Sequence, residues 1–333
     1  MTSTNLKPTR QRWQGQLIGF LPYIAGGLIF IVLPPLLPSY FQFMMAKIVI
    51  FAIFAISLDV IYGYTGLFSL GHAAFFGAGG YAVGILMVRY GINSFWIGAP
   101  LGILVAGLVA AVFGVIALRV SGTYFLLVTF ALGQVLFSVA TQWDFLSPMG
   151  GTEGIFNILR PDLGFPFTWN ATNFYYFVFL IFAICYFLMY RFINSPFGYA
   201  LQGIRENEHR VRSLGYNTWL YKYIAIIIAG LFAGLAGVLI AYHRGFVVPT
   251  SFGIITSALP MLMVMIGGAG TLYGPVIGSA VIIFIELFAS AYAPERWPLI
   301  LGGAFILAVV FVRGGIGVHL SRLWRRALLA WKP

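Results

Sequence analysis

Long apolar runs recur along this chain of 333 residues, and they constrain its fold more than any other feature. Each is about 20 residues long, the length that crosses a bilayer as an α-helix, and none alternates as a membrane β-strand does. Only 8% of the residues are charged, against about 25% in an average soluble domain. Because backbone groups in lipid must be satisfied internally, we expect an all-α fold, a polytopic membrane helical bundle.

Ten segments have the length and composition of membrane spans. The third and eighth are short for a hydrocarbon core of about 30 Å, which favours broken or re-entrant helices there. The ten segments are 17–37, 42–62, 73–90, 95–118, 122–142, 173–191, 222–242, 253–268, 272–293 and 297–313.

Basic residues predict the orientation of the bundle. If the N-terminus lies in the cytoplasm and the spans alternate, 14 of the 19 Lys and Arg residues fall on the cytoplasmic side, as the positive-inside rule requires. An odd number of spans would remove this asymmetry, so both termini are expected inside. The expected parts are a cytoplasmic tail at 1–16, a transmembrane domain at 17–313 with a cytoplasmic loop at 192–221 and an outer loop at 143–172, and a basic amphipathic tail at 314–333 that lies on lipid headgroups.

Motifs of catalysis are absent from the sequence. It has no phosphate-binding loop, dinucleotide-binding glycine pattern, zinc-protease motif, paired cysteines or serine-hydrolase elbow. One Cys and four scattered His residues make no metal site. The net charge of +11 sits at membrane edges, which excludes a nucleic-acid-binding domain. We expect no catalytic residue, no metal and no cofactor, and any ATP would be bound by partner subunits.

Two glycine-rich stretches, 63–84 and 267–280, interrupt the apolar pattern. Closely spaced glycines serve tight helix packing, which is the commoner role of any single one, or break a helix and expose backbone groups to a polar substrate. The first stretch also carries polar side chains, which are costly in lipid without a function. We therefore predict a substrate path there, formed by Gly63, Thr65, Gly66, Ser69, Gly71 and His72.

Two carboxylates lie within predicted spans, Asp59 and Glu286. Each is costly in lipid unless it is paired or faces water. Two interpretations stay open for both residues, a substrate or proton path and a structural polar contact between helices. Lys47, near the predicted outer surface, is expected to extend its ammonium group to the interface.

Four segments of the chain are similar to those of one transport family. They read SLDVIYGYTGLFSLGHAAFFGAGGYAVGIL at 57–86, GTYFLLVTFALGQVLFSVA with PMGGTEGI at 122–140 and 148–155, SPFGYALQGIRENEHRVRSLGYNTWLYKYIAIIIAGLFAGLAGVL at 195–239, and GGAGTLYGPVIGSA at 267–280. Their order and agreement over about residues 40 to 315 make the likeness specific. The chain resembles the permeases of branched-chain amino-acid ABC importers, specifically the LivM-like subunit of the hydrophobic amino-acid uptake family.

The resemblance implies a division of labour. The chain would be the permease subunit of an ATP-driven importer for branched-chain or other hydrophobic amino acids, in the plasma (inner) membrane of a bacterium or archaeon. Its partners would be a second related permease, two ATPase subunits that bind the ATP, and an extracytoplasmic solute-binding protein. Gly151, Thr152 and Glu153, in the predicted outer loop, suit the contact with the binding protein.

The polar segment 191–222 could be a plain connection between spans, but the resemblance makes it the ATPase-coupling loop. We predict a short helix over 203–215, ended by Gly215. Around residues 209–212 the chain is more basic than the family's pattern. Arg205, Glu206, Glu208, Arg210 and Arg212 would supply charge complementarity to the ATPase, and Leu201, Ile204 and Leu214 would supply an apolar grip.

Other functions stay open from the sequence. An importer of urea or short amides would share most of these motifs. A stand-alone ion-coupled secondary carrier or channel is a different class, for which two intramembrane carboxylates are few. A membrane-anchored structural protein would explain neither the polar glycine-rich stretch nor the charged loop.

Overall fold

The structure, a computed structural model, describes residues 30, 32–142, 151–164, 168–292, 299–300, 302–303, 306 and 315–317. This part of the chain is helical, with two isolated β-bridges and no strand. The elements are the 3-10 turn η1 (Pro34–Leu36), α2 (Ser39–Asp59), the π-helix η2 (Val60–Tyr64), α3 (Ala73–Tyr90), α4 (Phe95–Ala117), α5 (Thr123–Gln142), α6 (Ala171–Ile193), α7 (Pro196–Ser213), α8 (Thr218–Arg244), the 3-10 turn η4 (Pro249–Phe252), α9 (Ile254–Gly267) and α10 (Tyr273–Tyr292).

Seven of these helices are long and apolar enough to cross a membrane: α2 together with η2, α3, α4, α5, α6, α8 and α10. They confirm an all-helical membrane fold and coincide with seven of the ten predicted spans. The eighth predicted span is α9, whose 14 residues extend roughly 21 Å at 1.5 Å per residue, short of the hydrocarbon core. Only residues 30 and 32–37 of the first predicted span and 299–300, 302–303 and 306 of the tenth are described, and the tails 1–16 and 314–333 lie outside the described residues except for 315–317.

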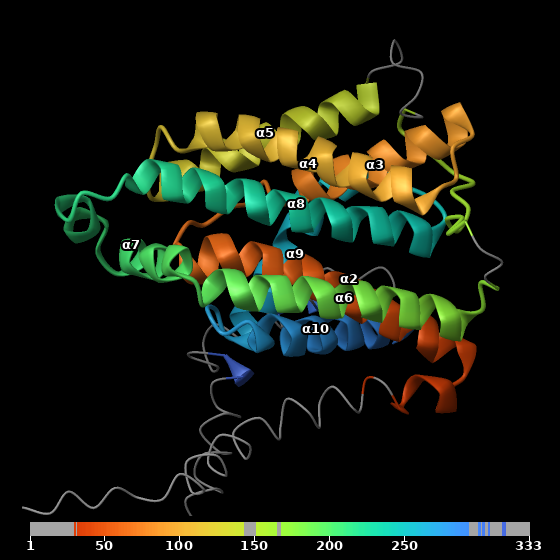
Figure 1. Cartoon of the computed structure of the whole chain (residues 1–333). Helices are drawn as coiled ribbons and strands as arrows, with labels where there is room; N and C mark the ends of the chain where they lie inside the picture. The colour runs from red at the N-terminus through yellow and green to blue at the C-terminus, as the bar shows by residue number, and fades with distance from the viewer. Residues whose placement is uncertain are drawn as a thin grey trace, which may run out of the picture.

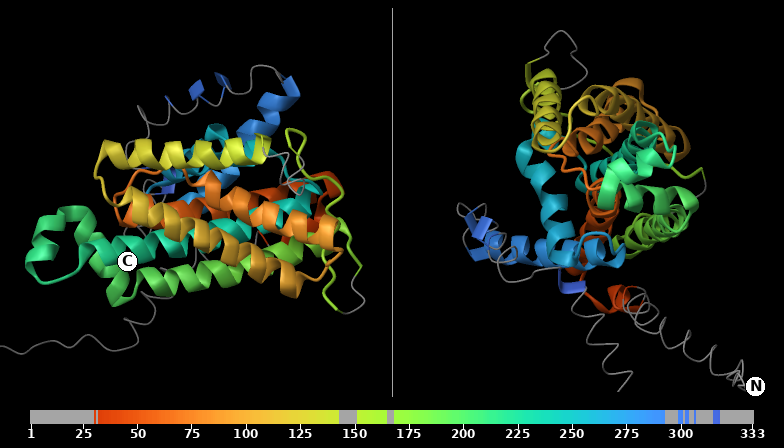
Figure 2. Two further views of the ribbon diagram at one scale, coloured as in Figure 1. Left: turned by 90° about the horizontal axis from the view of Figure 1, so that it is seen from above. Right: turned by 90° about the vertical axis from the view of Figure 1, so that its left-hand side faces the viewer.

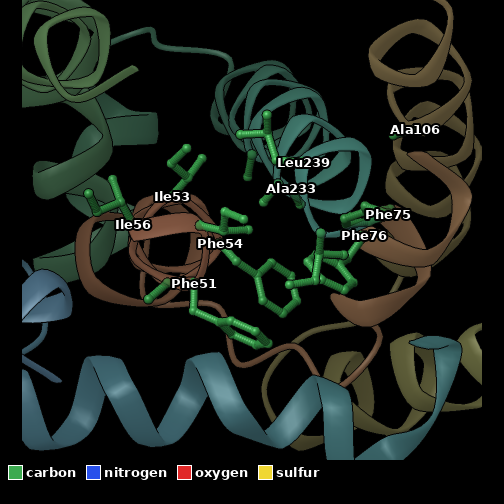
Figure 3. Packing of buried hydrophobic residues seen from close by; sticks show 14 of the residues in the cluster. Phe51, Ile53, Phe54, Ile56, Phe75, Phe76, Ala106, Ala233 and Leu239 are labelled. Atoms are coloured by element: carbon green, nitrogen blue, oxygen red, sulfur yellow. The ribbon is translucent and has the colours of Figure 1, made fainter. Parts of the chain in front are cut away.

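The long helices lie side by side along a common axis, and α7 projects from one end of the bundle (Figures 1 and 2). Helix α2 is central, since 89% of its most apolar stretch is buried. Phe51 and Phe54 of α2 pack toward Phe75 and Phe76 of α3, with Leu239 of α8 close by (Figure 3). A helix that is apolar on all sides belongs at such a buried position.

Glycines bring α3, α4 and α8 into backbone contact. A Cβ atom added to Gly79 would meet the backbone of Gly234, and one added to Gly237 would meet the carbonyl of Phe76. On α4, a Cβ atom at Gly102 would lie 2.9 Å from the carbonyl oxygen of Gly79. Lipid tails are as apolar as the side chains, so the hydrophobic effect does not drive helices together in a membrane. Van der Waals contact at such close approach is therefore a main term that stabilises their association. These three helices form one tightly packed unit.

The bundle has two distinct ends, which are fixed by α8. Helix α7 precedes α8 at one end, called here the α7 end. At the other end, called the loop end, the residues after α8 pair with the segment 151–164. Ile155 donates its backbone N–H to Val247 over 2.8 Å, and Ile158 donates to Gly245 over 2.9 Å. The described parts of the predicted loops 192–221 and 143–172 therefore lie at opposite ends, as two sides of a membrane require.

Candidate functional site

The first glycine-rich stretch breaks a helix at the α7 end. Helix α2 continues into the π-helix η2, and the chain then leaves the helix at Thr65 and stays irregular until α3 begins at Ala73. Gly66 has a φ of 78°, which favours glycine. The Thr65 hydroxyl donates over 2.8 Å to the carbonyl of Val60, the first residue of the π-helix, and so gives one of its carbonyls a partner. This irregular segment lies between the predicted spans 42–62 and 73–90, and the glycines from Gly77 to Gly84 belong to the unbroken helix α3, so a helix broken within a span stays a prediction.

The second glycine-rich stretch breaks the chain between α9 and α10. Gly268 and Gly270 have φ values of 113° and 76°, and residues 268–272 are not helical. The Thr271 hydroxyl donates to the carbonyl of Gly268 over 2.6 Å and accepts the backbone N–H of Gly274 over 3.2 Å. This turn starts α10 with its first N–H groups partly satisfied.

The two breaks touch, although about 200 residues separate them in the chain. The backbone N–H of Gly270 donates to Oδ1 of Asp59 over 2.8 Å, and Asp59 is fully buried. A Cβ atom on Gly63 would collide with that carboxylate and with the Gly270 nitrogen, so only glycine fits between them. The sequence left two interpretations of Asp59 open, a substrate or proton path and a polar contact between helices. The structure shows the polar contact.

Arg205 of α7 reaches this contact from outside the bundle. Its guanidinium donates a hydrogen bond to the carbonyl of Gly63. A Cβ atom on Gly270 would lie 3.0 Å from Nη1 of Arg205, and one on Gly66 would lie 3.1 Å from its Cγ. We call the set Asp59, Gly63, Gly66, Arg205 and Gly270 the glycine joint. It connects α7 to both helix breaks.

Helix α7 begins earlier than the sequence prediction. The Ser195 hydroxyl accepts a hydrogen bond from the backbone N–H of Gly198 over 3.3 Å, and Pro196 occupies the first helical position. The predicted helix start at residue 203 is therefore wrong. The missed signal was this Ser-Pro pair. The helix ends at Ser213 and Gly215 has a φ of 89°, which confirms the predicted glycine stop. Backbone angles at Asn207 are not helical, so α7 is kinked there.

The apolar side of α7 faces its own bundle. Leu201 and Ile204 are 0% and 4% exposed, so the prediction that they grip an ATPase is wrong. An amphipathic helix at a membrane surface uses its apolar face to dock on the spans beneath it. Leu214 is 72% exposed, and Glu206 and Arg210 are also exposed. The surface of α7 that is open to a partner is therefore mainly charged.

Glu208 of α7 is bonded to residues at the start of α8. Its carboxylate accepts hydrogen bonds from Lys222 over 2.6 Å, from the Thr218 hydroxyl over 3.0 Å and from Arg212 over 3.1 Å. Partial burial alone would raise the pKa of Glu208. The hydrogen bond and positive charge of Lys222, together with Thr218 and Arg212, have the larger combined effect, so the pKa of Glu208 lies below its usual value.

The polar residues after the first break are mostly buried and bonded within the chain. His72 is fully buried, its Nε2 lies 2.8 Å from the Ser57 hydroxyl, and its ring stacks on Phe54 at 5.3 Å. Thr65 and Ser69 are buried, while Gly66 is exposed. The predicted path residues therefore lie together around one break.

Three hydroxyl groups that sequence reasoning missed hold this segment from other helices. They are Ser57 of α2, Thr129 of α5 and Ser257 of α9. The backbone N–H of Leu70 donates to Thr129 over 3.3 Å, and that of Ala73 donates to Ser257 over 3.1 Å. A Cβ atom on Gly71 would collide with the carbonyl of Thr129. Isolated Ser and Thr residues within spans were the available signal, because such hydroxyls often bond across helices.

Glu286 and Lys47 form an ion pair of 2.8 Å between α10 and α2. Their side chains are 23% and 21% exposed, so the pair is largely covered. Glu286 therefore makes the structural contact between helices that was one of its two interpretations. Lys47, which was expected to extend to the interface, points its ammonium group to Glu286 of α10.

Gly151, Thr152 and Glu153 form a turn at the loop end. Thr152 and Glu153 are exposed, and Gly151 has a φ of 57°. The turn is held by the pairing of Ile155 with Val247. These three residues lie at the opposite end of the bundle from α7 and are accessible to a partner on that side.

Comparison with known proteins gives consistent matches. A family model described as "Branched-chain amino acid transport system / permease component" matches residues 40–310. The chain is similar to the high-affinity branched-chain amino acid transport system permease protein LivM of Salmonella typhimurium and of Escherichia coli, with 30% identity over 290 residues, 80% of this chain and 67% of each relative. A probable LivM protein of Methanocaldococcus jannaschii is 24% identical over 285 residues, 73% of this chain and 79% of that protein. No solved structure matches the chain.

Proposed function

This chain belongs to the branched-chain amino acid transport permease family, and from that membership we propose that it is a permease subunit of an ATP-driven importer of branched-chain or other hydrophobic amino acids. The observation that carries the proposal is the family match over residues 40–310. A multi-pass membrane bundle with a charged helix at one end supports it.

We place the chain in the plasma (inner) membrane of a bacterium or archaeon, paired with a second related permease. Two ATPase subunits would bind and hydrolyse ATP, so this chain itself would need no cofactor. A solute-binding protein would deliver the amino acid from outside. The family's role in transport supports partners of these kinds.

The proposed topology has ten spans with both termini in the cytoplasm. Seven long helices, the short α9 and the unequal distribution of basic residues support it. In this arrangement α7 lies on the cytoplasmic face. The turn Gly151, Thr152 and Glu153 lies outside, where it would contact the binding protein.

We propose α7 as the coupling helix. Glu206, Arg210 and Arg212 are exposed on it and would meet the ATPase, with Leu214 as an apolar contact beside Gly215. Glu208 and Arg205 would act inward: Glu208 holds α7 to α8, and Arg205 holds it to the glycine joint. A shift of α7 that follows closure of the ATPase dimer would therefore pull on both helix breaks as a rigid-body movement.

The substrate path is proposed along the first break, at Gly63, Thr65, Gly66, Ser69, Gly71 and His72. The irregular backbone from Thr65 to His72 leaves peptide groups outside any helix ladder, which suits recognition of a carboxylate. Most of the polar side chains there are buried and bonded internally, so a path would open when the glycine joint rearranges. Substrate choice would rest mainly on the binding protein.

The test is reconstitution of the chain with its partner permease and ATPase subunits in proteoliposomes. Leucine, isoleucine and valine presented on the binding protein should stimulate ATP hydrolysis and accumulate inside. Stimulation by urea or short amides alone would instead identify the related importer class. Uptake that needs an ion gradient and no ATPase subunit would overturn the importer assignment.

A further inference from the structure

A pocket of about 310 Å³ opens at the α7 end, between the α4–α5 loop, the second half of α7 and the start of α8. Its volume falls in the range of small-ligand sites, about 300–1,000 Å³. We call it the basic pocket and define it by the polar and aromatic side chains that line it: Arg119, Ser121, Glu208, His209, Arg212, Trp219 and Lys222.

The basic pocket carries an excess of positive charge. Three permanent cations line it, Arg119, Arg212 and Lys222, against one carboxylate. Glu208 is shared by Lys222 at 2.6 Å and Arg212 at 3.1 Å, so it neutralises only one of the two. Arg119 makes no ion pair with any residue in the described ranges. The unbalanced charge favours an anionic ligand.

An apolar track leads along α4 to the same pocket. Leu108, Val112 and Val115 are exposed and lie at four- and three-residue spacing, so they share one face of the helix. Arg119 follows at the next four-residue step, just past the end of the helix. A ligand with a charged head and a long apolar tail would match this arrangement of one basic site above one apolar stripe.

Aromatic residues mark the level of the membrane interface at the pocket. The rings of Trp219 and Tyr223 stack at 5.1 Å with an interplanar angle of 12°, and Trp219 is exposed. Trp and Tyr concentrate at the depth of lipid headgroups. This pair supports a position of the basic pocket near the depth of phospholipid phosphates.

We propose that the basic pocket binds the phosphate of an anionic phospholipid, with an acyl chain along the α4 stripe. Basic pockets between membrane helices recognise such headgroups through the same charge pairing. The bound lipid would contact Arg212 and Lys222, the two residues that tie Glu208 to α7 and α8. Lipid composition would thereby affect how firmly α7 is held.

The experiment counts retained lipids by native mass spectrometry. The full chain, in its complex with partner subunits, is reconstituted in nanodiscs of phosphatidylcholine with increasing phosphatidylglycerol and then released into detergent. Wild type should retain phosphatidylglycerol in preference to phosphatidylcholine. Because one basic residue near an anionic surface is worth about fivefold in binding, Arg119→Gln should lower the preference about fivefold, and Arg119→Lys should restore it.

The matched control is Arg191→Gln, which removes the same charge from an exposed position in the last turn of α6, at the same end of the bundle but outside the lining of the pocket. It should keep the preference. Val112→Gln should weaken retention of phosphatidylglycerol by disturbing the stripe. Equal retention of both lipids by wild type, or an equal loss in Arg191→Gln and Arg119→Gln, would overturn the proposal. Displacement of the lipid by free glycerol phosphate at matched concentration would assign the pocket to a soluble anion instead.

Discussion

The backbone N–H of Gly270 donates a hydrogen bond of 2.8 Å to the carboxylate of Asp59, and this bond joins α2 to the turn between α9 and α10. The acceptor is fully buried, so no water competes for it in the described conformation. Arg205 enters the same joint through the carbonyl of Gly63. A surface helix and two interior helix breaks thus share one small set of polar contacts.

Replacement of Asp59 should weaken this joint. Asp59→Leu leaves the half-buried Gly270 N–H without its partner, which costs up to about 1–3 kcal/mol. Asp59→Asn keeps an acceptor oxygen in place and should cost less. The measurement is thermal unfolding of the purified chain in detergent, followed by transport in proteoliposomes. Equal stability of the Leu and Asn variants would show that the hydrogen bond contributes nothing.

Replacement of Arg205 should separate ATPase binding from transport. Because its guanidinium is bonded to the interior carbonyl of Gly63, Arg205→Gln should leave co-purification of the ATPase subunits intact but reduce uptake by about tenfold or more. Arg210→Glu, on the exposed surface of the same helix, should instead reduce co-purification. A loss of co-purification in Arg205→Gln would place this residue at the ATPase surface.

The link made by Glu208 should depend on pH. Its pKa is held below the usual value in the folded chain, so its stabilisation is complete above the unfolded value of about 4.3 and is lost as the pH falls through the lower folded value. Hydrogen exchange of residues 208–222, corrected for intrinsic rates, should therefore become faster in that acidic window. Glu208→Gln should exchange faster at neutral pH and lose the acid-induced change. A wild-type pH response in the Gln variant would exclude Glu208 as its source.

The glycine contact between α3 and α8 should tolerate no added methyl group. Gly79→Ala places a Cβ atom against the backbone of Gly234, and overpacking of this kind costs about 1–3 kcal/mol. The matched control is Gly133→Ala in α5, where the nearest atom would be 3.5 Å away and alanine favours the helix. Thermal unfolding in detergent compares them. Similar melting temperatures for the two variants would mean that α3 and α8 can separate at little cost.

Much of the fold follows from features that are local in the sequence. Apolar runs of spanning length predicted seven helices, and Gly215 predicted the end of α7. Each of these depends on residues close together in the chain. Their physical causes, burial in lipid and backbone angles that only glycine adopts easily, act over one or two helical turns.

The candidate site depended on contacts that a single sequence does not show. The meeting of Asp59 with Gly270 and the pairing of Lys47 with Glu286 join residues more than 200 positions apart. The apolar face of α7 was visible in the sequence, but the sequence alone did not show whether Leu201 would face a partner or its own bundle. A helix lying on a membrane protein can satisfy the same pattern in either way.

The shortness of α9 has a consequence for how the protein is made. Its 14 residues are too few to cross lipid as an independent helix, and the short 3-10 turn η4 before it would leave backbone groups without hydrogen-bond partners in lipid. Its first turns are instead accommodated by helices synthesised much earlier, with Ser257 bonded to the start of α3 and Phe252 packed on Gly77. We therefore expect this segment to reach its place in the membrane only once α3 is there to pack against, so that the last third of the chain completes its fold against the first third.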